Sequence, residues 1–100
     1  MIIYEITAIV RADLIEKYEK YMRERHIPDL LETGCFRAAS FSCGEGNRYR
    51  IRYEAPDQNA LDEYLKNDAA RLRADFLEHF PEGVKVSREV WEVLESWQVD

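Results

Sequence analysis

Three arginines occupy alternate positions of one short segment, at Arg48, Arg50 and Arg52. Alternate positions of a β-strand point to the same side of a sheet, so these guanidinium groups share one face. Guanidinium groups bind carboxylates and other anions through paired hydrogen bonds. Segment 48–55 therefore predicts a strand with one cationic face. The opposite face is apolar, suits packing against helices, and comprises Tyr49, Ile51, Tyr53 and Ala55.

A second strand, predicted over residues 2–10, adds polar groups to the same side of the sheet. Its apolar face carries Ile2, Tyr4, Ile6, Ala8 and Val10, and its reverse includes Glu5 and Thr7. We predict a ligand site formed by Glu5, Thr7, Arg50 and Arg52. The alternative is that both arginines pair with acids on neighbouring strands, namely Glu5, Glu54 and Glu89, as surface ion pairs commonly do.

No catalytic residue is assigned, but His26 and Glu5 are the candidates for a general base. The spacing of residues around His26 supplies no serine, cysteine or second histidine that would complete a nucleophile and base pair. His26 is expected to end the first helix, where the negative helix terminus favours its protonated form. This structural interpretation is preferred over a catalytic one.

Composition excludes several classes of protein. Two histidines and two cysteines without a short paired spacing give no metal signature, and no cofactor is expected. A net charge of −6 opposes binding to nucleic acid or to anionic membranes. The amino end lacks the basic region of a signal peptide. Cys35 and Cys43 are predicted to lie on one strand, too far apart for a disulfide, so a cytoplasmic location is expected.

The remaining chain divides into helices and strands with clear boundaries. A helix is predicted over residues 14–26 with Asp13 as its N-cap, and Pro28 separates it from a brief second piece that Gly34 ends. Strand 35–43, a turn at residues 44–47 and strand 48–55 form a hairpin. Helices follow Pro56-Asp57 and Asn67-Asp68, and residues 84–94 form the last strand.

This order predicts an α+β protein of the ferredoxin-like type, a single domain spanning residues 1–100. Its pattern is β-α-β-β-α-β, with an antiparallel four-stranded sheet and all helices on one face. Pairing across the hairpin in which residue numbers sum to 91 places Phe41 opposite Arg50. The uncovered sheet face then carries apolar residues that favour a homodimer of two stacked sheets, namely Ile3, Ile9, Phe41 and Trp91.

Three segments carry a resemblance to a known group of proteins. They are the run His26-Ile27-Pro28-Asp29-Leu30-Leu31-Glu32-Thr33-Gly34-Cys35-Phe36, the run Tyr53-Glu54-Ala55-Pro56, and the run Ser87-Arg88-Glu89-Val90. The chain resembles the dimeric α+β barrel superfamily, which includes antibiotic-biosynthesis-monooxygenase-like proteins, and within it a bacterial family of unknown function. The resemblance implies a homodimer and a cleft between sheet and helices, and it transfers no catalytic residues.

These observations favour a homodimeric barrel that binds a small organic molecule, anions included. The first alternative is a cofactorless monooxygenase or isomerase, in which His26 or Glu5 abstracts a proton and an arginine stabilises the oxyanion. The second alternative is a purely structural dimer without a ligand.

Overall fold

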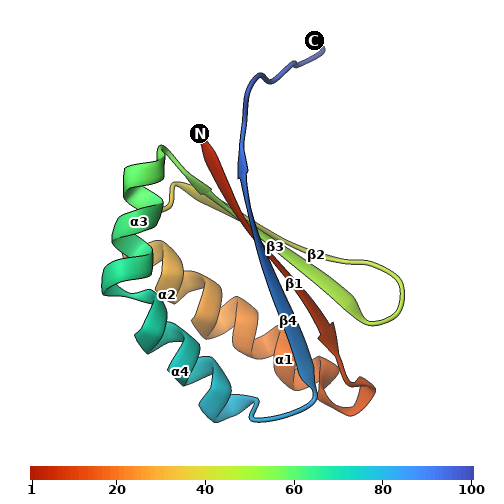
Figure 1. Cartoon of the computed structure of the whole chain (residues 1–100). Helices are drawn as coiled ribbons and strands as arrows, with labels where there is room; N and C mark the ends of the chain where they lie inside the picture. The colour runs from red at the N-terminus through yellow and green to blue at the C-terminus, as the bar shows by residue number, and fades with distance from the viewer.

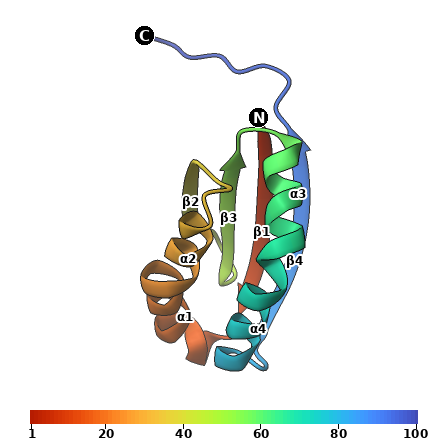
Figure 2. The same cartoon turned by 90° about the vertical axis from the view of Figure 1, so that its left-hand side faces the viewer.

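The alternating segments form one antiparallel sheet in the computed structural model, which describes residues 1–100. The strands are β1 (Ile2–Val10), β2 (Ala38–Cys43), β3 (Arg48–Ala55) and β4 (Val84–Glu92). Their order in the sheet is β2-β3-β1-β4, so β2 and β4 are the edge strands. All helices lie on one face of this sheet, as Figures 1 and 2 show. The predicted α+β ferredoxin-like fold is confirmed.

The first helical region is continuous, and the predicted break at Pro28 is wrong. Helix α1 (Ile15–Tyr21) passes through a wider π-helical turn (Met22–His26) directly into α2 (Ile27–Glu32). A proline ring clashes with the carbonyl group four residues earlier in a regular α-helix, here that of Glu24. The π-helical turn changes the hydrogen-bond spacing at this point, so Pro28 is accommodated and the helix does not end.

The start of this region also differs from the prediction, which made Asp13 the N-cap of the helix. Asp13 lies within a 3₁₀ turn (Ala12–Leu14) and caps no helix through its side chain. Instead, its carboxylate accepts a hydrogen bond of 2.6 Å from Nε of Arg11. Competition from the adjacent guanidinium group therefore replaces the expected cap.

The second helical region consists of α3 (Gln58–Asn67) and α4 (Ala69–His79). Asp57 is the N-cap of α3, and its side chain accepts a hydrogen bond of 2.9 Å from the backbone N–H of Ala60. The predicted boundary at Asn67-Asp68 is confirmed, because α4 begins directly after Asp68. Leu77 of α4 is 60% exposed.

The hairpin between β2 and β3 pairs one residue away from the predicted register. Residue numbers across it sum to 92, so Phe41 pairs with Ile51 and Ser42 with Arg50. The loop contains three residues, Glu45 to Asn47, and is closed by a hydrogen bond of 2.8 Å from Gly44 N–H to the carbonyl oxygen of Arg48. Asn47 adopts a φ of 56°, a left-handed conformation typical of three-residue hairpin loops.

This register moves Phe41 from the predicted uncovered face to the helix-covered face. Its ring packs against Tyr18 and Tyr49, with ring centroids 6.1 and 5.5 Å away. Phe41 is therefore part of the core and not of the proposed dimer surface. The uncovered face still carries Ile9 and Trp91, which are 49% and 54% exposed, whereas Ile3 is already buried within the single chain.

Candidate functional site

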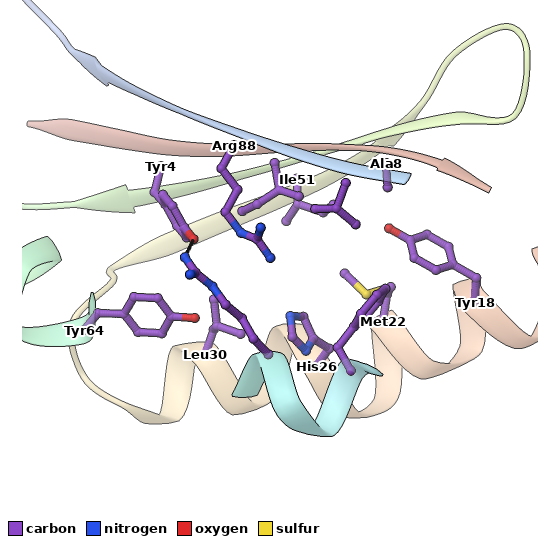
Figure 3. Close-up of a pocket in the computed structure, with 13 residues that line it drawn as sticks. Tyr4, Ala8, Tyr18, Met22, His26, Leu30, Ile51, Tyr64 and Arg88 are labelled. Atoms are coloured by element: carbon purple, nitrogen blue, oxygen red, sulfur yellow. Dashed lines mark hydrogen bonds between the residues drawn. The ribbon is translucent and has the colours of Figure 1, made fainter. Parts of the chain in front are cut away.

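A cavity lies between the inner face of the sheet and the helices (Figure 3). Its volume is about 40 Å³, enough for roughly three water molecules at about 10 to 15 Å³ each. Most of its walls are apolar or aromatic, and they include Ile6, Met22, Leu30, Ile51 and Phe76. A mostly apolar lining with a few converging polar groups is the usual composition of a ligand site.

One helix supplies a row of wall residues at four-residue spacing, Tyr18, Met22, His26 and Leu30. In a regular α-helix, which has 3.6 residues per turn, each such step rotates the side chain by about 40° away from the first. The π-helical turn over Met22–His26 is wider and rotates the following residues back. The wide turn thus keeps all four side chains directed at the cavity.

Two arginines enter the cavity from opposite walls. Arg88 extends from β4 across the sheet face toward the helices (Figure 3). Arg73 belongs to α4 on the helical side and also lines the cavity. Arg73 Nη2 donates a hydrogen bond of 2.9 Å to the hydroxyl oxygen of Tyr4, while its Nε is buried without a partner. No aspartate or glutamate lines the cavity, and neither arginine forms a salt bridge. The cavity is therefore cationic without an internal counter-ion.

The cavity is reached along the edge of the sheet. Arg88 lies on the outer strand β4 opposite Ile6 of β1 and is exposed along that edge. Its neighbour Val90 is 50% exposed, and Leu77 of α4 is 60% exposed. Arg88 thus connects the solvent at the edge of β4 with the interior.

His26 is a third polar group in the cavity wall. Its ring packs against Tyr21 and Phe76, at centroid distances of 5.8 and 5.6 Å. Its Nδ1 atom is buried and has no hydrogen-bond partner. Burial, assisted by the positive charge of Arg88, lowers the pKa of His26 to about 4, although Asp29 and Asp75 oppose this shift. The imidazole is consequently neutral at pH 7.

Asp75 lies near His26 but is already engaged by other groups. Its carboxylate accepts hydrogen bonds of 2.6 Å from the hydroxyl group of Tyr21 and 2.7 Å from Nη2 of Arg25. The Tyr21 hydroxyl group is the main cause that lowers the pKa of Asp75. This carboxylate is thus occupied outside the cavity and leaves the inner arginines without a carboxylate partner.

Tyrosine hydroxyl groups complete the polar lining. Burial raises the pKa of Tyr64, while Arg73 and Arg88 partly offset this change. Burial also raises the pKa of Tyr18, which lines the same cavity. Both tyrosines are neutral at pH 7 and carry hydroxyl groups that can donate hydrogen bonds, in addition to those from the guanidinium groups, to an anion.

The predicted ligand residues lie elsewhere, on the uncovered face of the sheet. Glu5 pairs with Arg52 across β1 and β3, and Glu5 Oε1 is 3.4 Å from Arg52 Nε and 3.9 Å from Arg50 Nε. Thr7 pairs with Arg50 in the same register. Glu5, Thr7 and Arg50 line a groove of about 460 Å³. The four predicted residues are thus neighbours, and their arginines share one carboxylate.

His26 was one of the residues singled out from the sequence, but the prediction gave it the wrong local structure. His26 lies inside a continuous helix and not at a helix end. Arg73 and Arg88 were missed. Arg88 occupies an inward position in the alternation of Val84, Val86 and Val90, and an arginine at such a position was the available signal.

No group of three or more histidine, cysteine, aspartate or glutamate side chains is placed to hold a metal ion. Both cysteines are free thiols, Cys35 partly buried and Cys43 exposed. No helix combines the length and apolar character that a membrane span requires.

The fold and its inner cavity define a ferredoxin-like α+β protein. A similar structure is an EthD (ethyl tert-butyl ether degradation) family protein from Bacillus halodurans, with a TM-score of 0.73 and 12% identity, covering 94% of this chain and 100% of that chain. A putative antibiotic biosynthesis monooxygenase from Nitrosomonas europaea has a TM-score of 0.66 and 13% identity, with coverages of 95% and 100%. A dimeric ferredoxin-like protein from an uncultured marine organism has a TM-score of 0.64 and 17% identity, with coverages of 96% and 97%.

The chain belongs to the family described as Domain of unknown function (DUF4286), whose model matches residues 1–94. No curated protein is significantly similar in sequence. The similarity to the solved structures, at identities of 12 to 17%, establishes the fold.

Proposed function

We propose that this protein binds a small organic carboxylate in the cavity between sheet and helices. The observation that carries the proposal is the pair Arg73 and Arg88, two guanidinium groups in an apolar cavity without an acidic residue. Arg73 is half-buried and Arg88 is exposed at the edge of the sheet, and a bound carboxylate would form charge-assisted hydrogen bonds with both guanidinium groups. Arg88 at the cavity mouth would capture the anion, and Arg73 would bind it on the opposite side.

Binding is preferred over proton abstraction by His26. A general base works best when its pKa lies near the working pH. The pKa of His26 is lowered to about 4, so the imidazole takes up a proton poorly at pH 7. Its neutral form is better suited to hydrogen bonding with a ligand.

The uncovered sheet face supports a second part of the proposal, a homodimer of stacked sheets. Ile9 and Trp91 expose apolar surface on this face, and apolar patches of this kind commonly mark protein interfaces. The dimeric state of the similar ferredoxin-like protein from the marine organism agrees with this arrangement. We place the protein in the cytoplasm, since its two cysteines are free thiols.

The test is a comparison of two arginine variants. Isothermal titration with propanoate, benzoate and citrate at pH 7 would measure affinity for the native protein, Arg88→Met and Arg50→Met. Loss of charged hydrogen bonds should weaken binding of the favoured acid to Arg88→Met by roughly 10- to 100-fold. Arg50→Met removes an arginine from the uncovered face and should leave affinity unchanged.

Each outcome separates the candidates. Loss of binding in Arg50→Met, with Arg88→Met unaffected, would move the site to the predicted residues Glu5, Thr7, Arg50 and Arg52. Absence of binding for every acid would favour the purely structural dimer. Arg88→Lys is the matched variant, because it retains the charge but loses the two-pronged geometry and should bind with intermediate affinity.

A further inference from the structure

The polar atoms that lack partners in the cavity restrict the ligand beyond its carboxylate. Arg73 Nε and His26 Nδ1 are both buried and unpartnered. They belong to different helices, α4 and the helix that runs from α1 to α2, so they approach the cavity from separate positions. A carboxylate held by the two arginines would engage the guanidinium atom and leave the imidazole atom unsatisfied.

The imidazole needs a second polar group on the ligand. A neutral histidine ring carries one donor and one acceptor nitrogen, and its tautomer decides which of them is Nδ1. In one tautomer Nδ1 accepts a hydrogen bond from a hydroxyl group, and in the other it donates one to a carbonyl oxygen. Both tautomers therefore call for an oxygen close to the carboxylate.

The dimensions of the cavity set how close that oxygen must be. A volume of about 40 Å³ holds roughly three water-sized groups. A carboxylate and one oxygen-bearing carbon fill that space, and any remaining chain must lie at the mouth beside Arg88. Fused aromatic rings would require Met22, Leu30 or Phe76 to move.

We propose, on the basis of the carboxylate site described above, that the ligand is a short carboxylic acid with a hydroxyl or keto oxygen on the carbon next to the carboxylate. The carboxylate binds Arg73 and Arg88, and the neighbouring oxygen binds Nδ1 of His26. The ligand class is thus the 2-hydroxy or 2-oxo acids.

Three acids of equal chain length test the contribution of the second oxygen. Lactate carries a hydroxyl group, pyruvate a keto group, and propanoate neither. A satisfied buried hydrogen bond should make lactate or pyruvate bind roughly 3- to 10-fold more tightly than propanoate in isothermal titration at pH 7. The keto oxygen of pyruvate can only accept a hydrogen bond, whereas the hydroxyl group of lactate can donate or accept one, so a preference for pyruvate would identify the tautomer with the proton on Nδ1.

The variant His26→Phe separates this proposal from the carboxylate site itself. Phenylalanine keeps an aromatic ring against Tyr21 and Phe76 but has no nitrogen. The ratio of the affinity for lactate or pyruvate to the affinity for propanoate should therefore fall to about 1, while the affinity for propanoate itself remains. Equal binding of all three acids to the native protein would overturn the 2-oxygen proposal and leave the carboxylate site standing. Absence of binding by all three would overturn both. Tighter binding of 2-naphthoate than of lactate would refute the size argument.

Discussion

Acidification should destabilise this protein through a single buried imidazole. Burial lowers the pKa of His26 from 6.5 to about 4 in the folded state. In the unfolded chain the group has its ordinary pKa, so between about pH 6.5 and 4 only the unfolded state binds this proton. Because the unfolded state then binds more protons, the free energy of unfolding decreases as the pH falls. The contribution of His26 is complete above pH 6.5 and is lost toward pH 4.

The size of this effect follows from the shift in pKa. Each unit corresponds to about 1.4 kcal/mol, so the full contribution of His26 is about 3 kcal/mol. Relative to pH 7.5, the loss is about 1 kcal/mol at pH 5.5 and about 2 to 3 kcal/mol at pH 4.5. A domain of this size has a total stability of about 5 to 15 kcal/mol, so the loss is readily measured.

The effect of His26 is isolated by urea unfolding, which measures the free energy of unfolding of the native protein and of His26→Phe at pH 7.5, 5.5 and 4.5. The carboxylates titrate in both proteins, so their effects cancel in the difference between the two free energies of unfolding. Only the native protein carries the imidazole of His26. The free energy of unfolding of His26→Phe relative to the native protein should therefore increase by about 1 kcal/mol at pH 5.5 and by about 2 to 3 kcal/mol at pH 4.5, compared with pH 7.5. His79→Phe removes the other histidine and should not reproduce this change. Parallel loss of stability in the native protein and His26→Phe would refute the reasoning.

Three substitutions test local features of the fold by urea unfolding. Gly83→Ala should lower the free energy of unfolding by roughly 1 to 3 kcal/mol more than Gly34→Ala. Both glycines have positive φ, +85° and +78°, but only at Gly83 would the added Cβ meet a neighbour, Leu14 Cδ1 at 2.6 Å. Equal losses of stability in the two variants would show that this contact is unimportant. Phe41→Ala should cost about 2 kcal/mol and leave the sedimentation coefficient unchanged, whereas dissociation without loss of stability would support the register in which Phe41 faces outward. Asp57→Ala should cost about 1 kcal/mol through loss of the helix cap, and Asp57→Asn should lose little; equal losses would exclude the cap.

The strands and the side of the sheet that each residue faces were predictable where alternation is strict. Strand 48–55 is the clearest case, because four apolar residues alternate with charged ones along its whole length, and its bounds agree with β3. The register of its hairpin partner was not predictable in the same way. It depends on whether the loop contains an odd or an even number of residues, and both Gly46 and Asn47 can adopt positive φ. A one-residue difference then reversed the face of Phe41.

The inner arginines were not predicted because an arginine side chain combines a long apolar stem with a charged head group. Arg88 lies at an inward strand position, yet long charged side chains usually extend their heads to solvent, so sequence reasoning assigned it no role. Arg73 is adjacent to the buried residue Leu72 on α4 and was passed over for the same reason. Position in the chain does not reveal the missing counter-ion. The absence of an acidic residue beside these arginines can be recognised only in the folded structure, where strands and helices far apart in the sequence form the cavity.

The placement of the tryptophans gives the protein an unusual optical signature. Trp91 and Trp97 are the only two in the chain, and they are 54% and 79% exposed. The interior is lined instead by tyrosine and phenylalanine rings. Indole fluorescence therefore reports on the outer side of the sheet and the carboxyl-terminal segment, while events in the core leave it unchanged. A blue shift of that emission with increasing protein concentration would record the pairing of sheets, independently of ligand binding inside.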